Sequence, residues 1–159
     1  MRFNPIDLGL LILVSTVAGI QFLRGKNNFS LLFFETLGAI GAGKVAYDFA
    51  KAHYPFALFF FPCLILFLIT ARVLNGFFPF SLGVFDLLFS FIFGITFGWA
   101  IGFGVVRSLF PLIARNPVLL QMLVKSWMAS QIVSLGFLRE LLALFVQAKY
   151  HNLPIPSKP

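Results

Sequence analysis

Four apolar runs, each about as long as a lipid bilayer is thick, dominate this sequence and limit what it can fold into. Only 11% of the residues are charged, whereas a soluble domain of this size carries roughly 25%. Inside lipid, the backbone polar groups of a segment have to be satisfied by the segment itself, so each run is predicted to be a helix. The sequence therefore predicts an all-α integral membrane bundle with four transmembrane helices, at about Ile6–Leu23, Phe29–Phe49, Phe56–Leu74 and Leu82–Phe110.

These runs assign residues 1–113 to a membrane domain and leave a different kind of segment after it. In residues 114–149 the polar side chains are spread around the helix, which favours two short helices at the membrane interface or against the bundle. A fifth crossing at 132–146 is the alternative, and it would place the Arg139–Glu140 pair in lipid at roughly 2.5 to 3.5 kcal/mol per charge. Residues 150–159 contain three prolines and are predicted to be an extended tail.

The first run has a second interpretation, as a cleaved signal peptide, because Arg2 precedes an apolar stretch. Asp7 lies at the start of that stretch, and no clean small-x-small cleavage site follows it. We therefore expect the first run to remain as a membrane span.

A ladder of small residues led by an acid runs through the fourth span: Asp86, Ser90, Gly94, Gly98 and Gly102. Residues four positions apart lie on one side of a helix, so the ladder is a flat strip of backbone. In lipid, such strips bring helices together because they allow two backbones to approach closely. The strip predicts a helix-packing face, either toward a second copy or a partner protein, or toward another helix of the same chain.

Three acids lie within or at the start of spans, namely Asp7, Glu35 and Asp86. Asp7 and Asp86 each begin a span, where the positive end of a helix favours an anion, so both fit helix caps or interfacial anchors. Their alternative role is an ion or proton site facing the interior of the bundle. Glu35 lies about two turns into the second span and is expected either to snorkel to the interface or to meet another helix.

Sequence signatures of enzymes and of nucleic-acid binding are absent. His53 and His151 are far from any other metal-ligating residue, and no phosphate-binding loop, paired cysteine set or nucleophile elbow is present. The net charge of +7 comes from single basic residues at the ends of apolar runs, not from a cluster that could follow a phosphate backbone. We therefore expect no catalytic residues, no metal or cofactor, and no nucleic-acid partner.

The basic residues also predict an orientation. With four spans, one membrane side carries Arg2, Lys51, Arg107 and Arg115, and the other carries Arg24, Lys26 and Arg72. The segment after the last span adds further positive charge to the first side. The positive-inside rule then favours both termini on the cytoplasmic side.

Three stretches of the chain, in order, are similar to those of a known family. Asn4-Pro5-Ile6-Asp7 opens the first span, and Arg24-Gly25 follows it. The aspartate-led ladder and the element Trp127-x-x-Ser130 come next. Together they resemble the CvpA family, the colicin V production proteins of bacterial inner membranes. The chain departs from that pattern at Asn27, Asn28 and Phe29, where the family usually has an acid, and at Leu87 and Phe97, where it often has basic residues.

The resemblance implies a small multi-pass protein of the bacterial inner membrane, linked to toxin export or envelope function. Together with the ladder, it favours a non-enzymatic assembly or accessory subunit that oligomerises or docks through the face of Ser90, Gly94, Gly98 and Gly102. Its expected partners are the lipid bilayer and either itself or a larger membrane complex. The alternative function is ion or proton conduction through Asp86, with Glu35 as a second candidate.

Overall fold

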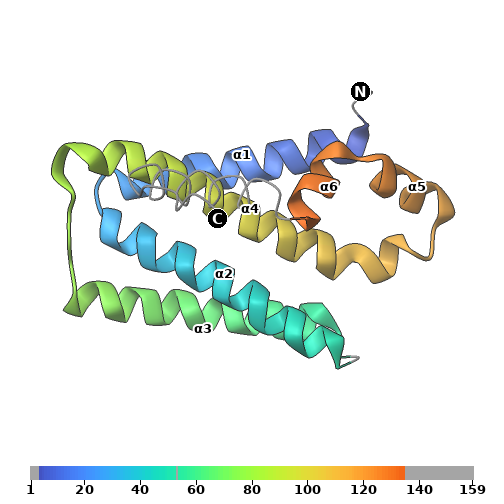
Figure 1. Ribbon diagram of the computed structural model, residues 1–159, viewed down its shortest axis with the longest axis horizontal. Helices are drawn as coiled ribbons and strands as arrows, with labels where there is room; N and C mark the ends of the chain where they lie inside the picture. The colour runs from blue at the N-terminus through green and yellow to red at the C-terminus, as the bar shows by residue number, and fades with distance from the viewer. Residues whose placement is uncertain (1–3, 53, 135–159) are drawn as a thin grey trace, which may run out of the picture.

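A computed structural model describes residues 4–52 and 54–134 of the chain, and these residues form helices and their connections, with no strand among them. The prediction of an all-α bundle is confirmed (Figure 1). The elements follow one another as α1 (Pro5–Gly25), α2 (Phe29–Lys51), α3 (Phe56–Phe77), a 3₁₀ turn η1 (Gly83–Phe85), α4 (Asp86–Ile113), α5 (Pro117–Lys125) and α6 (Trp127–Val133).

Four of these helices are long and apolar enough to cross a membrane, and they correspond to the four predicted spans. The chain is a multi-pass membrane protein. α4 extends through Pro111 to Ile113, slightly beyond the predicted end at Phe110. The alternative crossing at 132–146, the Arg139–Glu140 pair and the tail lie largely or wholly outside the described residues.

Asparagine side chains begin several of the helices. The Asn4 side chain accepts a hydrogen bond from the Asp7 backbone N–H, and Pro5 occupies the first helical turn, where proline is favoured. Asn28 caps α2 and Asn116 caps α5 in the same way. These N-caps fix where α1, α2 and α5 begin.

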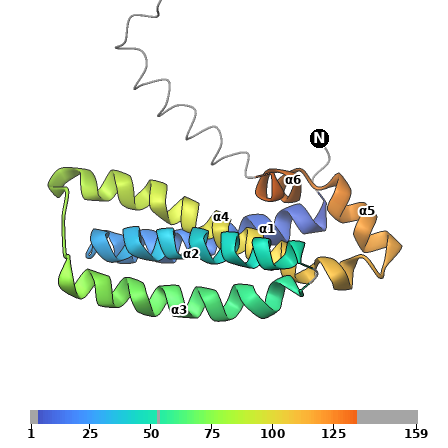
Figure 2. The same cartoon turned by 60° about the horizontal axis from the view of Figure 1, so that its bottom comes forward.

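The four long helices form two antiparallel pairs, α1 with α4 and α2 with α3, as Figures 1 and 2 show from two directions. α2 also contacts α4 and so joins the pairs, while α3 lies on the outside. The exposure agrees with this order, because 56% of the apolar window of α2 is buried but only 11% of that of α3. α3 is also the most apolar of the four, as expected of the helix with the largest lipid-facing surface.

A second seam of small residues, not recognised in the sequence, lets α2 occupy this central position. Ala39, Ala42 and Ala46 are fully buried along one side of α2. On α4, Gly104 leaves room for the completely buried ring of Phe60 from α3, since a β-carbon there would lie 2.0 Å from the Phe60 Cζ atom. The core therefore depends on close approaches at several helix crossings.

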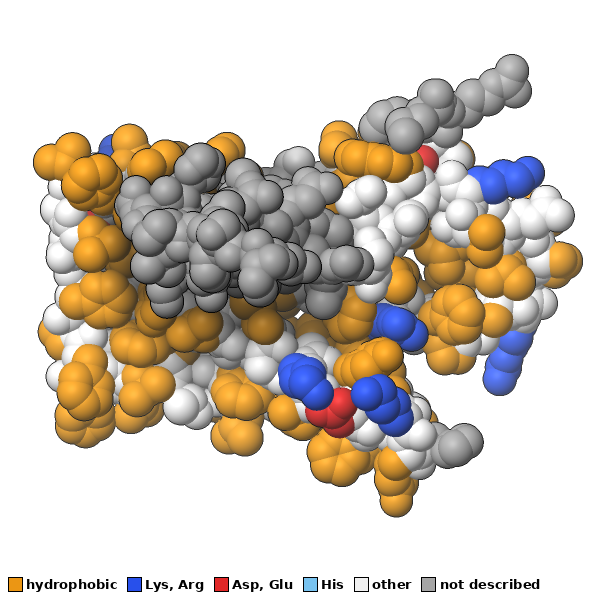
Figure 3. All heavy atoms as spheres, viewed as in Figure 1, with side chains coloured by type: hydrophobic (Ala, Val, Ile, Leu, Met, Phe, Trp, Pro, Cys, Tyr) orange, Lys and Arg blue, Asp and Glu red, His pale blue; other side chains and the backbone are white. Residues whose placement is uncertain are grey.

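The two ends of the bundle differ. α5 and α6 lie at the end that also holds the start of α1, the connection between α2 and α3, and the end of α4 (Figure 1). In the face shown in Figure 3, apolar side chains cover most of the length, and most of the visible Lys and Arg lie toward this end. We call it the α5–α6 end.

Candidate functional site

The strip of small residues on α4 faces α1 of the same chain. A β-carbon added to Gly94 would lie 2.9 Å from the backbone oxygen of Ala18, and one added to Gly98 would lie 2.8 Å from that of Val14. These distances are shorter than β-carbon contacts in proteins. The two helices thus approach closely because both positions lack a side chain, as expected of a small-residue seam in lipid.

Both ends of the strip are also covered. Ser90 is fully buried, and a β-carbon added to Gly25 at the end of α1 would lie 2.7 Å from its hydroxyl oxygen. At Gly102, the nearest atoms are the side chains of Val14 and of Ile132 from α6, at 3.2 and 3.3 Å. The sequence left open whether the strip packs against another protein chain or against another helix of the same chain. In this structure it packs within the chain, because α1 and α6 cover it.

Asp7 is a buried carboxylate, 2% exposed, that joins α1 to α6. Its Oδ2 atom accepts the Asn4 backbone N–H at 3.0 Å, which completes a capping box at the start of α1. Its Oδ1 atom accepts the Ser126 hydroxyl at 2.6 Å and the Met128 backbone N–H at 2.9 Å. One carboxylate therefore caps the first turns of two helices that are far apart in the sequence.

Two further hydrogen bonds strengthen this junction. The Ser126 hydroxyl accepts the Ala129 backbone N–H at 3.0 Å and so acts as the N-cap of α6. The Asn4 side-chain amide donates to the Met122 backbone oxygen in α5 at 2.7 Å. We call Asn4, Asp7, Ser126 and Met128 the Asp7 junction.

Replacing Asp7 with alanine is expected to release α6 from the bundle. The substitution leaves the Ser126 hydroxyl and the Met128 N–H without an acceptor in a buried setting, at about 1–3 kcal/mol per group. Ala129, 3% exposed, reports on this release. In a Cys63→Ser background, a cysteine at position 129 should resist maleimide in the parent protein and react in the Asp7→Ala variant.

The matched control is Asp48→Ala, which removes an acid from the surface of α2, where it pairs with Lys44 and Lys51. This variant should leave the cysteine at 129 protected. Equal protection in the Asp7→Ala variant would mean that the Asp7 junction does not hold α6.

Glu35 contacts another helix, which is one of the two arrangements expected from the sequence; the other was an extension of its side chain to the membrane interface. Its side chain is 3% exposed and forms an ion pair with Arg24 of α1, with Arg24 Nη2 2.9 Å from Glu35 Oε1 and Nη1 3.1 Å from Oε2. Gln21 Nε2 donates to the same Oε2 atom at 3.1 Å. The fork of the guanidinium matches both carboxylate oxygens, the stronger geometry for such pairs.

Asp86 lies at the first residue of α4 and is partly exposed. Its carboxylate accepts the Leu82 backbone N–H at 2.6 Å and the Ser81 hydroxyl at 2.5 Å. Gly83, with φ +64°, allows the chain to turn between these donors and the helix. Asp86 therefore organises the connection that leads into α4.

The structure brings together residues that the sequence presented as separate motifs. Trp127 and Ser130 are exposed on α6, while their neighbours Ser126 and Met128 bind Asp7. Gly25, next to Arg24, lies against Ser90 of the strip. The resemblance marked Gly25, Trp127 and Ser130, whereas no sequence signal pointed to Ser126 or Met128. Nothing in the local sequence specifies which distant segment each residue contacts.

Comparison of the chain with known protein families, with curated proteins and with solved structures finds no match in any of the three. Among residues 4–52 and 54–134, no group of three or more His, Cys, Asp or Glu side chains is placed to hold a metal ion. The arrangement of charges is therefore the main indication of what the protein does.

Proposed function

We propose that this protein is a non-enzymatic assembly or accessory subunit of the CvpA type in the bacterial inner membrane, associated with toxin export or envelope function. The observation that carries the proposal is the way its buried carboxylates are used. Asp7 accepts three hydrogen bonds, two of which join α1 to α6, and Glu35 is held by Arg24 and Gln21 of the neighbouring helix. Both acids serve to hold helices together.

A conducting or catalytic carboxylate has to change its partners or its protonation during the cycle. In this protein such a change would remove the acceptor from buried donors at each site, which is costly in a low-dielectric surrounding. The Asp7 and Glu35 sites are therefore suited to a permanent structural role. Asp86 is bonded to the connection before α4, at the end of the span.

The outer face of α3 is the surface that we assign to a partner. The strip on α4 is already covered, whereas α3 exposes a row of aliphatic side chains: Leu58, Ile65, Leu66, Ile69 and Val73. Ile65, Ile69 and Val73 are four residues apart, Leu58 is seven residues before Ile65, and Leu66 is three residues before Ile69. These spacings place the five side chains along one side of the helix. A neighbouring membrane helix can pack along such a row.

The resemblance to the CvpA family adds support from the residues that carry it. Asn4 and Asp7 lie beside the segment of Trp127, and Gly25 lies beside Ser90. Motifs separated by many residues thus form two common contacts, as expected if they act as parts of one folded unit.

The test is the mass and composition of the native complex, extracted with its lipids in polymer discs through a C-terminal tag. We expect either another membrane protein in fixed ratio or a closed oligomer, and substitution of Ile65 and Ile69 by tryptophan should disrupt it. The same substitutions at Leu8 and Ile12, an exposed pair on α1, serve as the control. A single chain in every preparation would contradict the proposal.

The rival function, conduction through Asp86, is distinguished by flux. If it operates, the purified protein conducts ions or protons in liposomes and Asp86→Asn abolishes the current. We expect no flux above that of empty liposomes for either protein, since Asp86 is bonded to Ser81 and Leu82.

A further inference from the structure

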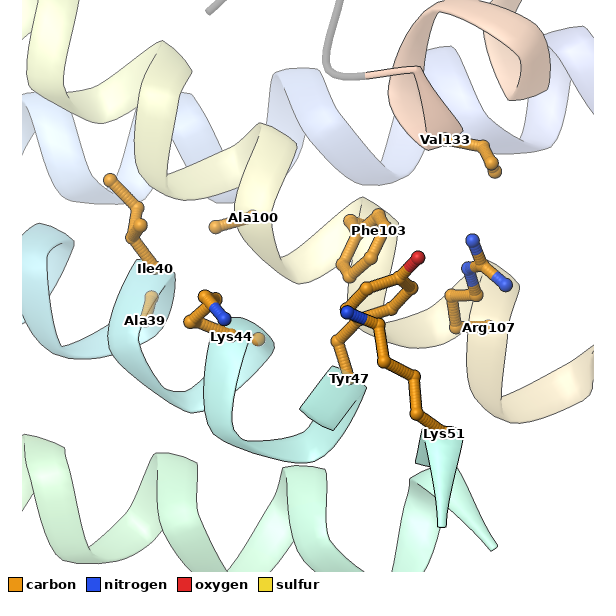
Figure 4. A pocket seen from close by; sticks show the side chains of 10 residues that line it. Ala39, Ile40, Lys44, Tyr47, Lys51, Ala100, Phe103, Arg107 and Val133 are labelled. Atoms are coloured by element: carbon orange, nitrogen blue, oxygen red, sulfur yellow. The ribbon is translucent and has the colours of Figure 1, made fainter. Parts of the chain in front are cut away.

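A cavity of about 530 Å³ opens between α2 and α4 beside α6, near the α5–α6 end. Lys44, Tyr47 and Lys51 line it from α2, Phe103 and Arg107 from α4, and Val133 from α6 (Figure 4). The remaining lining residues are small or aliphatic. One side of the cavity is therefore basic and the other is apolar.

The basic side is arranged around the ring of Tyr47. Lys51 Nζ lies 4.7 Å from the centre of this ring, and the guanidinium carbon of Arg107 lies 5.4 Å from it. Figure 4 shows the two side chains beside the tyrosine ring, Lys51 from α2 and Arg107 from α4. Cations near the face of an aromatic ring are attracted to it, so Tyr47 helps to place both positive groups beside the cavity.

The charge at this site is not balanced within the described part of the chain. Asp48 pairs with Lys44 at 2.5 Å and with Lys51 at 3.7 Å. No carboxylate among residues 4–52 and 54–134 comes within ion-pair distance of Arg107. Its Nε atom is buried and has no hydrogen-bond acceptor among those residues. Among the described residues, the three cations that line the cavity thus have one carboxylate near them, and it pairs only with the two lysines. Together with the buried donor of Arg107 that lacks an acceptor there, this charge balance favours an anionic ligand.

A second cavity of about 270 Å³ adjoins the first at Arg107 and Val133. Arg107 and Val133 line both cavities, and the second is otherwise bounded mainly by Val106, Phe110, Leu123 and Val124. A ligand with a charged group beside Arg107 therefore has apolar surface on both sides of that group.

The site also lies at the depth of lipid headgroups. α2 has 23 residues and ends at Lys51, which corresponds to about 35 Å of helix against a hydrocarbon core of about 30 Å. Arg107 lies within the last two turns of α4, at the same end of the bundle. Both charges are thus at the boundary between the hydrocarbon core and the headgroups.

We propose that this cavity binds an anionic phospholipid, with the phosphate held by Arg107 and Lys51 and an acyl chain along the apolar side. Arginine offers a planar pair of donors to phosphate oxygens, and basic pockets between membrane helices on the cytoplasmic side suit such headgroups. The basic and apolar halves fit the two parts of one lipid molecule.

The test compares phosphatidylglycerol with phosphatidylcholine, titrated into the detergent-purified full chain and counted by native mass spectrometry. Phosphatidylglycerol should bind about tenfold more tightly, and the Lys51→Gln/Arg107→Gln variant should lose about tenfold or more of that affinity. Its affinity for phosphatidylcholine should not change. Lys26→Gln/Arg72→Gln, which removes the same charge at the opposite end, should bind both lipids as the parent protein does.

Three results would overturn the proposal. An equal loss of phosphatidylglycerol affinity in the control variant would mean that the lipid is attracted only by the net charge of the protein. Equal affinity of the parent protein for the two lipids would mean that the basic side of the cavity does not bind the headgroup. Displacement by an equal concentration of inorganic phosphate would indicate a free-phosphate site. If the double variant does not fold, Lys51→Gln alone decides, because its side chain is 62% exposed and its loss should not affect the core.

Discussion

A leucine at Gly98 is expected to push α1 away from α4 and to lower the stability of the bundle strongly. Even a β-carbon at this position would lie 2.8 Å from the backbone oxygen of Val14. Because that oxygen belongs to the helix backbone, the clash can be relieved only if α1 moves as a whole. Overpacking of this kind costs roughly 1–3 kcal/mol and occasionally more, and the leucine should reach the upper end of that range. The measurement is unfolding in a detergent titration, followed by circular dichroism.

The chain provides its own control for this substitution. Gly19 also lies within a membrane helix, but no atom lies within 4 Å of a β-carbon added there. Gly19→Leu should therefore unfold at the same detergent concentration as the parent protein, or at a higher one. Equal loss of stability in both variants would mean that glycine is needed for its backbone, and that close packing on α1 is not the reason.

The same reasoning predicts a gradation along the strip. Alanine at Gly94 meets a backbone oxygen at 2.9 Å, whereas alanine at Gly102 meets only the ends of the Val14 and Ile132 side chains. Flexible side chains can shift by a few tenths of an ångström where a helix backbone cannot. Gly94→Ala should accordingly lower stability more than Gly102→Ala.

Removing Arg24 is expected to have the second large effect, because it leaves the Glu35 carboxylate buried without its charge partner. Breaking a buried ion pair from one side costs roughly 3–5 kcal/mol. The Arg24 side chain is 42% exposed, so water can replace part of the interaction, and we expect Arg24→Gln to fall at the lower end of that range. Detergent unfolding again gives the comparison with the parent protein.

The double variant Arg24→Gln/Glu35→Gln separates two quantities: the net stabilisation by the ion pair, and the cost of burying the Glu35 carboxylate without a partner. With both groups neutral, much of the lost stability should return, since Gln21 can still hydrogen-bond at position 35. Lys44→Gln, which breaks a pair whose side chains are 68% and 48% exposed, should change stability by no more than about 0.5 kcal/mol. A double variant less stable than Arg24→Gln would contradict the account of this pair.

The number and positions of the spans could be predicted from sequence because they depend on local properties. A run such as Phe56–Leu74 is apolar for the length of a bilayer crossing, and caps such as Asn4, Asn28 and Asn116 mark where helices begin. In lipid, the helical state itself follows from the need to satisfy the backbone. Predicting these four helices required no knowledge of how they pack against one another.

Pairing between helices could not be predicted, because a small-residue strip shows that a helix is approached closely but not by which partner. The sequence does not show whether Gly94 and Gly98 pack against α1 or against a second copy of α4. The contact of Glu35 with Arg24 and that of Asp7 with Ser126 depend on how the turns bring the spans together. The basic cavity was missed for the same reason, since Lys51 and Arg107 converge from different helices.

The measurement that tests most directly whether the strip packs within one chain is a disulfide between Val14→Cys and Gly102→Cys, in a Cys63→Ser background. A β-carbon at 102 would lie 3.2 Å from the Val14 Cγ2 atom. A cysteine sulfur in the place of that Cγ2 atom would therefore be within reach of a sulfur attached to the β-carbon at 102, given an S–S bond of about 2.05 Å. After oxidation in native membranes, we predict an internal cross-link that changes the mobility of the monomer on a denaturing gel. The two single-cysteine variants should form no such product. Dimers linked between positions 14 and 102 of different chains would contradict the account. They would mean that the strip packs between chains and mediates assembly.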